Sequence, residues 1–198
     1  MSKPNFVVKD KDTNKEYWIS RSICVIPIVF KIEDNIIYTL IEKRGKSVSN
    51  VGKWCCPCGY LDWNETLEEA CVREVGEETG VQLNIRDVHF VSYNSSPNES
   101  RQNVGIRFCC FVPPYTELDK NKIVTKDEVD DIEWLRIGNF DVNGFVNTDM
   151  SMLVNLTCDV IKIDSKLIND RKWAFNHNEL IIEVLTQYYK GNINVIVV

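Results

Sequence analysis

The sequence predicts an α/β fold in which β-strands alternate along the chain with two helices. Two observations predict it: several short runs are rich in β-branched and apolar residues, and two longer segments have the composition and spacing of helices. The chain of 198 residues is also long enough to bury a core of its own, and no repeat, low-complexity tract or Gly/Ser-rich linker divides it. We therefore expect residues 1–198 to form a single domain.

The first predicted elements are the two strands of a hairpin. Residues 23–32 and 36–41 are β-branched apolar runs, and the turn-like residues Glu33, Asp34 and Asn35 separate them. Further strands are expected at residues 88–93, 104–112 and 129–137.

Two segments have the features of helices. Residues 65–79 are helix formers and stop at Gly80, which suits the position after the last turn of a helix. Residues 178–189 repeat apolar side chains at helical spacing. No structure is assigned to residues 140–175, where a long connection or a short extra helix would fit.

The charge balance is acidic, with a net charge of −6. Binding to duplex DNA or to an anionic membrane requires a broad basic surface. We therefore expect neither a duplex nucleic acid nor a membrane as a partner, but a small molecule and metal ions. Residues 1–18 lack the apolar core of a secretory signal, and no apolar run approaches membrane-spanning length, which predicts a cytoplasmic protein.

The eight cysteines favour free, buried thiols over a disulfide framework. Cys55-Cys56 and Cys109-Cys110 are adjacent pairs, and the other cysteines stand in apolar surroundings. A zinc site built from Cys55-x-x-Cys58 with Cys109 and Cys110 is an alternative, although this pattern departs from the spacing of zinc ribbons.

Residues 62–78 hold seven acidic side chains and one basic side chain, Arg73. A charge run is usually the solvated face of a helix. At about 100° per residue, however, Glu74 and Glu78 fall on the apolar arc of this helix, with Glu77 at its edge. The apolar arc consists of Leu67, Ala70, Cys71 and Val75. We therefore expect these carboxylates to point inward or along the wall of a cleft.

Carboxylates gathered in this way repel one another, and burial increases the cost. Gly76 adds about 1 kcal/mol, because glycine in a helix interior is less favourable than alanine. Mg²⁺ or Mn²⁺ would compensate, since these ions bind through a few carboxylates together with substrate phosphates. The sequence thus predicts a metal-phosphate site with Glu74, Glu77 and Glu78 as ligands and Arg73 as an orienting residue.

The same residues belong to a longer pattern with fixed spacing. Gly59 is followed after five residues by Glu65, and after seven more by residues 73–81, which read Arg-Glu-Val-Gly-Glu-Glu-Thr-Gly-Val. This pattern resembles the Nudix box at every specified position. The resemblance implies an α/β/α sandwich with a mixed β-sheet, and hydrolysis of a nucleoside diphosphate linked to another moiety.

The resemblance also implies roles for the residues of the box. In that family the glutamates that match Glu74, Glu77 and Glu78 bind divalent metals, and the arginine that matches Arg73 positions them. The position of Glu65 supports the loop and helix, and the box also fixes glycines at Gly59 and Gly80. Relatives are often dimers, so the analogy extends to a homodimer.

Two local sequences differ from the usual family pattern. Relatives usually have Pro-Gly-Gly before the helix, whereas this chain has Pro57-Cys58-Gly59. If the first glycine position required a positive φ, Cys58 would be strained. Near the last helix, residues 174–177 are similar to an Ala-Phe-Asp-His element of many relatives, with Asn176 in place of the acid.

Candidates for the remaining chemistry are less sharply defined. The proton acceptor would be Glu78 or an acid of the loop at residues 126–128, where Glu128 is the extra candidate, although loop acids are usually solvated. Arg44 and Arg101 are candidates for phosphate contacts, because guanidinium groups match phosphate oxygens, and they fit ordinary surface arginines equally well.

ADP-ribose or another nucleoside diphosphate sugar is the favoured substrate, with dinucleotides second. Pro97 lies sixteen positions after Val81, which resembles the mark of ADP-ribose-type pyrophosphatases. Tyr60, Trp63 or Phe90 would stack on a base or fill a core.

Two other functions fit the same fold. A non-catalytic nucleotide sensor would usually carry a fused DNA-binding segment or a degraded box, and the sequence shows neither. An isomerase would need no net addition of water, so product analysis separates it from a hydrolase.

Overall fold

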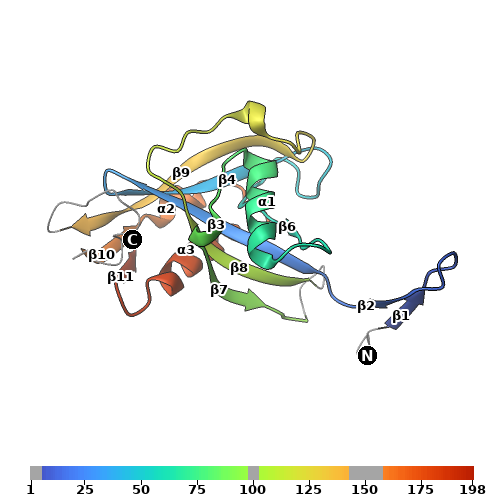
Figure 1. Cartoon of the computed structure of the whole chain (residues 1–198). Coiled ribbons are helices and arrows are strands. Elements are labelled where there is room, and N and C mark those ends of the chain that lie inside the picture. Colours follow the sequence, from blue (N-terminus) through green and yellow to red (C-terminus); the bar gives the residue numbers. More distant parts are fainter. Residues whose placement is uncertain (1–5, 98–102, 143–157) are drawn as a thin grey trace.

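The computed structural model describes residues 6–97, 103–142 and 158–198, in which a nine-stranded sheet is the central feature (Figure 1). The strand order is β11-β10-β9-β4-β3-β8-β7, and the short strands β5 and β6 pair with β4 and β3. The strands of this sheet are β3 (Ile23–Glu33), β4 (Ile36–Arg44), β5 (Trp54–Cys55), β6 (Gly59–Tyr60), β7 (Val88–Asn94), β8 (Val104–Phe111), β9 (Val129–Val142), β10 (Cys158–Ile163) and β11 (Asn194–Val197).

The sheet is mixed, as the resemblance implied. The pairs β3 with β8 and β10 with β11 are parallel, and the remaining pairs are antiparallel. The predicted strands at residues 23–32, 36–41, 88–93, 104–112 and 129–137 are confirmed.

Helices cover both faces of the sheet, which confirms the α/β/α sandwich (Figure 1). Side chains of β3 alternate between the two faces. Val25 and Val29 pack in the cluster beneath α1 (Leu67–Thr79), while Ile28 and Phe30 pack in the cluster beneath α3 (His177–Tyr188).

The hairpin between β3 and β4 closes through a two-residue loop. Glu33 pairs with Ile36, and both loop residues, Asp34 and Asn35, have positive φ. Two residues with positive φ match the right-handed twist of the flanking strands, and Asn and Asp tolerate that conformation better than most residues.

Helix α1 begins two residues later than predicted. Thr66 is its N-cap and forms a capping box with Glu69: the Thr66 hydroxyl accepts from Glu69 N at 3.2 Å, and Thr66 N donates to Glu69 Oε2 at 2.8 Å. Glu65 therefore lies before the helix, which leaves its carboxylate available to Arg73. The helix ends as predicted at Gly80, whose φ of 72° is left-handed.

The unassigned stretch at residues 140–175 contains regular structure where the chain is described. It holds the end of β9, then β10 and the short helix α2 (Ser165–Asn169), while residues 143–157 lie outside the described part. The short extra helix that the sequence left open is present as α2, whereas β10 was not predicted. Short 3-10 turns also occur at η1 (Ile85–Asp87) and η2 (Lys120–Lys122).

The two first strands form a separate hairpin that the sequence analysis did not predict. Strands β1 (Phe6–Lys9) and β2 (Glu16–Ile19) pair only with each other among the described strands, and they extend away from the main sheet (Figure 1). In the described part of the chain, no helix is long and apolar enough to cross a membrane.

Candidate active site

A cavity of about 620 Å³ lies where the first residues of β3 and β8 meet the loop before α1 and the start of α3. Its floor is formed by adjacent residues of the parallel strands, because Cys24 pairs with Gly105 and Ile26 with Arg107. Side chains of α1 form one wall and side chains of α3 another. The charged residues of the lining are Arg44, Asp62, Arg73, Glu74, Glu78, Arg107, Glu128, Glu179 and Glu183.

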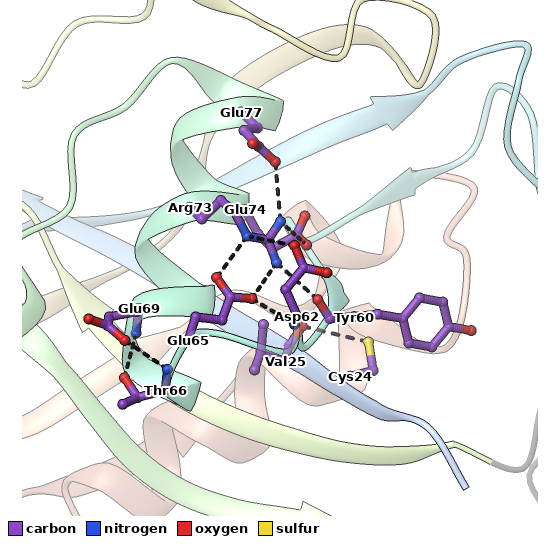
Figure 2. Close-up of polar contacts among 10 residues, drawn as sticks. All are labelled: Cys24, Val25, Tyr60, Asp62, Glu65, Thr66, Glu69, Arg73, Glu74 and Glu77. Atoms are coloured by element: carbon purple, nitrogen blue, oxygen red, sulfur yellow. Dashed lines mark hydrogen bonds and ion pairs between the residues drawn. The ribbon is translucent and has the colours of Figure 1, made fainter. Parts of the chain in front are cut away.

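Arg73 joins the carboxylates of the box (Figure 2). Its Nε and Nη2 donate to the two oxygens of Glu65 at 2.9 and 2.7 Å, and its Nη1 lies 2.7 Å from Glu74 Oε1 and 3.2 Å from Glu77 Oε2. Nη2 also donates to the Tyr60 carbonyl at 2.9 Å. One guanidinium thus fixes the loop before the helix and two of the predicted metal ligands.

Glu74 is buried against the backbone of Gly59. A Cβ added at Gly59 would lie 2.0 Å from Glu74 Oε1, so only glycine leaves room for this carboxylate. Burial raises the pKa of Glu74, although its ion pair with Arg73 acts in the opposite direction. The close approach of backbone and carboxylate explains the glycine at this position of the box.

Glu78 belongs to a buried cluster that the sequence analysis did not predict. Its Oε2 accepts from the Cys58 backbone N–H at 2.9 Å. Glu42 on β4 is buried beside it, interacts with its carboxyl group, and accepts a hydrogen bond from the Cys55 thiol at 3.3 Å through Oε1. Desolvation raises the pKa of Glu42 to about 8, and burial followed by the charge of Glu42 raises the pKa of Glu78.

Cys58 is not strained in the position where relatives have glycine. Neither Cys58 nor Gly59 has a positive φ, so the backbone here needs no glycine on conformational grounds. The polar contacts of Cys58 with Cys24 and Cys55 lower the pKa of the Cys58 thiol, although its burial acts in the opposite direction. The concern that Cys58 distorts the loop is therefore removed.

The other predicted site residues fall in different places. Glu77 is not among the residues that line the cavity, and its side chain is 38% exposed beside Arg73. Glu128 does line the cavity. Its backbone carbonyl accepts a hydrogen bond from Gly45 N at 2.6 Å. Arg101 lies outside the described residues.

Arg44 lines the cavity and is largely buried. Its Nε donates to the Ser49 carbonyl at 2.6 Å, and its Nη1 lies 3.7 Å from Cys55 Sγ. Since Cys55 contacts Glu42, these contacts connect Arg44 to the buried carboxylates. This placement distinguishes Arg44 from an ordinary surface arginine.

The sequence analysis did not propose His177 as a site residue, nor the ion pair between Arg107 and Glu183. His177 is buried in the cavity wall, its Nδ1 accepts from Cys56 N at 3.0 Å, and desolvation lowers its pKa. Arg107 on β8 pairs with Glu183 on α3 at 2.5 Å. His177 belongs to the residues similar to the Ala-Phe-Asp-His element, which is the signal that would have identified it.

The cysteines occupy two separate cores. Cys109 and Cys110 follow each other on β8, so they point to opposite faces of the sheet and belong to different apolar clusters. They therefore cannot converge with Cys55 and Cys58 on one zinc ion. In residues 6–97, 103–142 and 158–198, no three His, Cys, Asp or Glu side chains are placed to enclose a metal by themselves.

The carboxylates nevertheless fit a hard divalent cation that shares its coordination with a ligand. Glu74 and Glu78 line one cavity, and both lie in surroundings that disfavour their negative charge. Glu42 is buried next to Glu78, so these two carboxyl groups need a shared proton or a cation between them. Mg²⁺ typically uses one or two carboxylates and keeps waters or substrate phosphates as its other ligands. Two carboxylates that leave the other coordination positions free therefore suit Mg²⁺ better than a complete set of protein ligands would.

The fold and the box together define a class of nucleotide-processing domain. A family model described as a NUDIX domain matches residues 24–151, and the chain belongs to this family. The box residues lie within the matched part, and the sandwich is the fold of this family.

Two curated relatives share part of this sequence. The chain is 35% identical over 83 residues to the NAD-capped RNA hydrolase NUDT12 of Macaca fascicularis, a match that covers 42% of this chain and 16% of that protein. It is 44% identical over 52 residues to putative nudix hydrolase 1 of Caenorhabditis elegans, covering 26% of this chain and 14% of the relative. The matches span at most about a quarter of these and similar relatives.

Two solved structures share the fold at low sequence identity. A MutT/nudix family protein from Enterococcus faecalis has a TM-score of 0.62 at 18% identity, over 86% of this chain and 62% of that one. The NUDIX domain of Shewanella oneidensis NrtR, solved in a complex with ADP ribose, has a TM-score of 0.56 at 17% identity, over 86% and 90% of the two chains.

Proposed function

We propose that this protein hydrolyses the diphosphate bond of a nucleoside diphosphate linked to another moiety, with Mg²⁺ or Mn²⁺ as the cofactor. The observation that carries the proposal is the burial of two carboxylates, Glu74 and Glu78, in the wall of a cavity that also exposes arginines. Buried carboxylates are destabilising unless something neutralises them. A cation shared with a diphosphate would neutralise both groups at once.

The residues of the box have separate tasks in this proposal. Glu74 and Glu78 would hold the cation, and Glu77 would complete the set if its carboxylate turned from Arg73 toward the cavity. The bound cation would supply charge neutralisation at the phosphate oxygens and lower the pKa of a bound water. Arg73 contacts Glu74 and Glu77, so it holds their carboxylates in position.

Arg44 is the residue we propose for contact with a substrate phosphate. Its guanidinium lines the cavity close to the buried carboxylates, and a planar fork of donors matches phosphate oxygens. A phosphate contact by Arg101, the other arginine proposed from the sequence, stays a prediction.

Glu128 is the residue we propose as proton acceptor, alongside Glu78. It lies on the loop directly before β9 and lines the same cavity. A general base must come within hydrogen-bond reach of the attacking water, directly or through one other water. Glu78 already accepts a hydrogen bond from the Cys58 backbone N–H and is proposed as a metal ligand, which favours Glu128 for this role.

ADP-ribose is the first compound to test as a substrate, followed by other nucleoside diphosphate sugars and then dinucleotides. ADP ribose is the ligand in the Shewanella domain, which shares the fold. NUDT12 is named for NAD-capped RNA, which contains a dinucleotide diphosphate. A cavity of about 620 Å³ has the size of sites that take ligands of this kind.

The experiment is a panel of these compounds with Mg²⁺ in ¹⁸O-labelled water, analysed by mass spectrometry of the products. The wild type should split the diphosphate, and the position of ¹⁸O names the phosphorus that water attacks. Glu78→Gln should lose more than about a hundred-fold in kcat/KM, because even residues that merely support metal ligands cost 10- to 100-fold.

Glu68→Gln is the matched control, since Glu68 lies on the same helix outside the cavity lining. It should retain the wild-type rate. Binding without any cleavage by the wild type would support the sensor alternative, and a product without incorporated ¹⁸O would support isomerase chemistry. Either result would contradict the proposed hydrolysis.

A further inference from the structure

Phe175 stands in an unusual conformation at the edge of the cavity. Its φ is 60° and that of the next residue, Asn176, is 58°, so two consecutive residues without glycine are left-handed. Asparagine tolerates this conformation, but a bulky side chain such as phenylalanine rarely adopts it. Strain of this kind persists only where the surroundings impose it, and it concentrates at functional sites.

Contacts on both sides hold the strained residues in place. Ala174 N donates to the Trp54 carbonyl at 2.9 Å, and His177 N donates back to the Ala174 carbonyl at 3.2 Å. The His177 ring is fixed in turn by the Cys56 backbone N–H. The turn at residues 174–177 is therefore attached to Trp54 and Cys56, in the segment that leads into the box.

The result of this conformation is a phenyl ring in the cavity wall. Phe175 remains 42% exposed although the residues around it, Ala174 and His177, are buried. The centre of the Arg44 guanidinium lies 5.0 Å from the ring centroid, and the His177 ring lies 5.4 Å away at 52°. The ring is thus both accessible from the cavity and restrained by two neighbours.

The position of the ring relative to the carboxylates is set by a short series of contacts. Arg44 contacts Phe175 on one side and Cys55 on the other, and Cys55 donates to Glu42 in the cluster with Glu78. A nucleotide whose diphosphate lies near Arg44 and Glu78 therefore has Phe175 close to the base that its ribose carries. Flat heterocycles stack on aromatic faces, and a ring that is already restrained loses little freedom when they do.

We infer that Phe175 is the platform on which the heterocyclic base of the nucleotide stacks, a role that rests on the proposed function. Among the aromatic residues considered from the sequence, Trp63 and Phe90 do not line the cavity, whereas Tyr60 does. The Tyr60 hydroxyl accepts from Nδ2 of Asn103, the residue before β8, at 3.2 Å. Phe175 then determines which end of the substrate carries the base.

The test compares the binding of two ligands to three proteins by calorimetry in Mg²⁺. The ligands are the α,β-methylene analogue of ADP-ribose, which has a base, and methylene diphosphonate, which has none. Phe175→Leu should weaken the first about ten-fold, within the range for loss of an aromatic platform, and leave the second unchanged. Phe175→Trp should bind both ligands at least as tightly as the wild type does.

Kinetics and three further variants, Phe175→Gly, Phe90→Leu and Tyr60→Leu, complete the test. With ADP-ribose, Phe175→Leu should raise KM about ten-fold and leave kcat within about two-fold, as expected when only binding is lost. Phe175→Gly removes the backbone strain, so it should fold and still bind the analogue weakly. Phe90→Leu, at a 59% exposed position outside the cavity lining, should behave as wild type.

Three results would overturn the inference: wild-type affinity in Phe175→Leu, an equal loss for both ligands, or a loss that appears in Tyr60→Leu instead. Failure of the proposed function is a separate result. In that case the wild type binds the methylene analogue with a Phe175-dependent affinity but cleaves none of the panel. Cleavage that does not depend on Phe175 would support the proposed hydrolysis and contradict the stacking role of Phe175.

Discussion

At the scale of single residues, the helical period was enough to predict Glu74 and Glu78 as inward-facing carboxylates. The same reasoning missed Glu42, because the predicted strand ended at Ile41. Alternation along β4 provides the missing signal: Leu40 is buried in the core, so Glu42 and Arg44 lie on the same face. Phe175 had no comparable signal, since its position depends on the hydrogen bond from Ala174 N to the Trp54 carbonyl and on the Arg44 guanidinium.

Gly59→Ala tests whether the glycine of the box exists to admit Glu74. The added Cβ would lie 2.0 Å from Glu74 Oε1, so the carboxylate must move. A displacement of about 1 Å at a catalytic group can cost about a hundred-fold in rate, and we expect a loss of that size in kcat/KM with an unchanged circular dichroism spectrum. Wild-type activity in this variant would mean that the position of Glu74 does not matter.

Because of Glu42, the free energy of unfolding of the metal-free protein should decrease as pH rises. The pKa of Glu42 is raised from 4.5 to about 8 in the folded protein, so between these values the folded state holds a proton that the unfolded state has lost. The free energy of unfolding must then fall as pH rises through this window. We expect Glu42→Gln to flatten the slope in urea unfolding measured between pH 5 and 8 in EDTA.

Glu78 and Glu74 also have raised pKa values, so a reduced slope is expected in Glu42→Gln rather than none. Glu69→Gln is the comparison, since that carboxylate is exposed and belongs to the capping box. A slope in Glu42→Gln as steep as that of the wild type would contradict the buried, protonated state of Glu42.

At the scale of secondary structure, the sequence placed the long strands and both long helices but not the short elements. Helix α1 begins at Leu67 because Thr66 caps it, and the spacing of Thr66 and Glu69 is that of a capping box. Strands β5 and β6 have two residues each and form only because the chain passes β4 and β3. No local pattern predicts pairs of that length.

Gly76→Ala tests whether the glycine inside α1 has a steric reason. A Cβ added at Gly76 would meet nothing within 4 Å, in contrast to Gly59. The variant should therefore be more stable by about 1 kcal/mol in urea unfolding, the difference in helix propensity. Activity should be unchanged. A less stable variant would show that the helix is constrained at Gly76 by something other than local space.

At the scale of the whole molecule, the cavity joins segments that are far apart in the chain. Arg107 and Glu183 come from β8 and α3, and Phe175 reaches Arg44 across more than half of the chain. The box predicted one wall because it is local in sequence. The opposite wall depends on the strand order, in which β3 lies between β4 and β8, and single-sequence patterns do not determine that order.

The β1–β2 hairpin is the part of the described chain that we expect to open first. It forms a sheet of its own, its apolar residues Val7, Val8 and Trp18 are exposed, and a lone two-stranded hairpin is marginally stable in water. In hydrogen exchange followed by mass spectrometry, amides of residues 6–19 should exchange well before those of β3 and β4. Equal protection of the hairpin and the central strands would contradict this expectation.

The account depends most on a cation held by the carboxylates of α1, which Mn²⁺ binding measures directly by electron paramagnetic resonance. With AMP present, the wild type and Glu68→Gln should reduce the signal of free Mn²⁺, and Glu78→Gln should bind at least about ten-fold more weakly. Without nucleotide the wild type should bind Mn²⁺ more weakly, because two carboxylates leave most of the coordination to other ligands. Equal binding by wild type and Glu78→Gln, or none by either, would contradict the central claim.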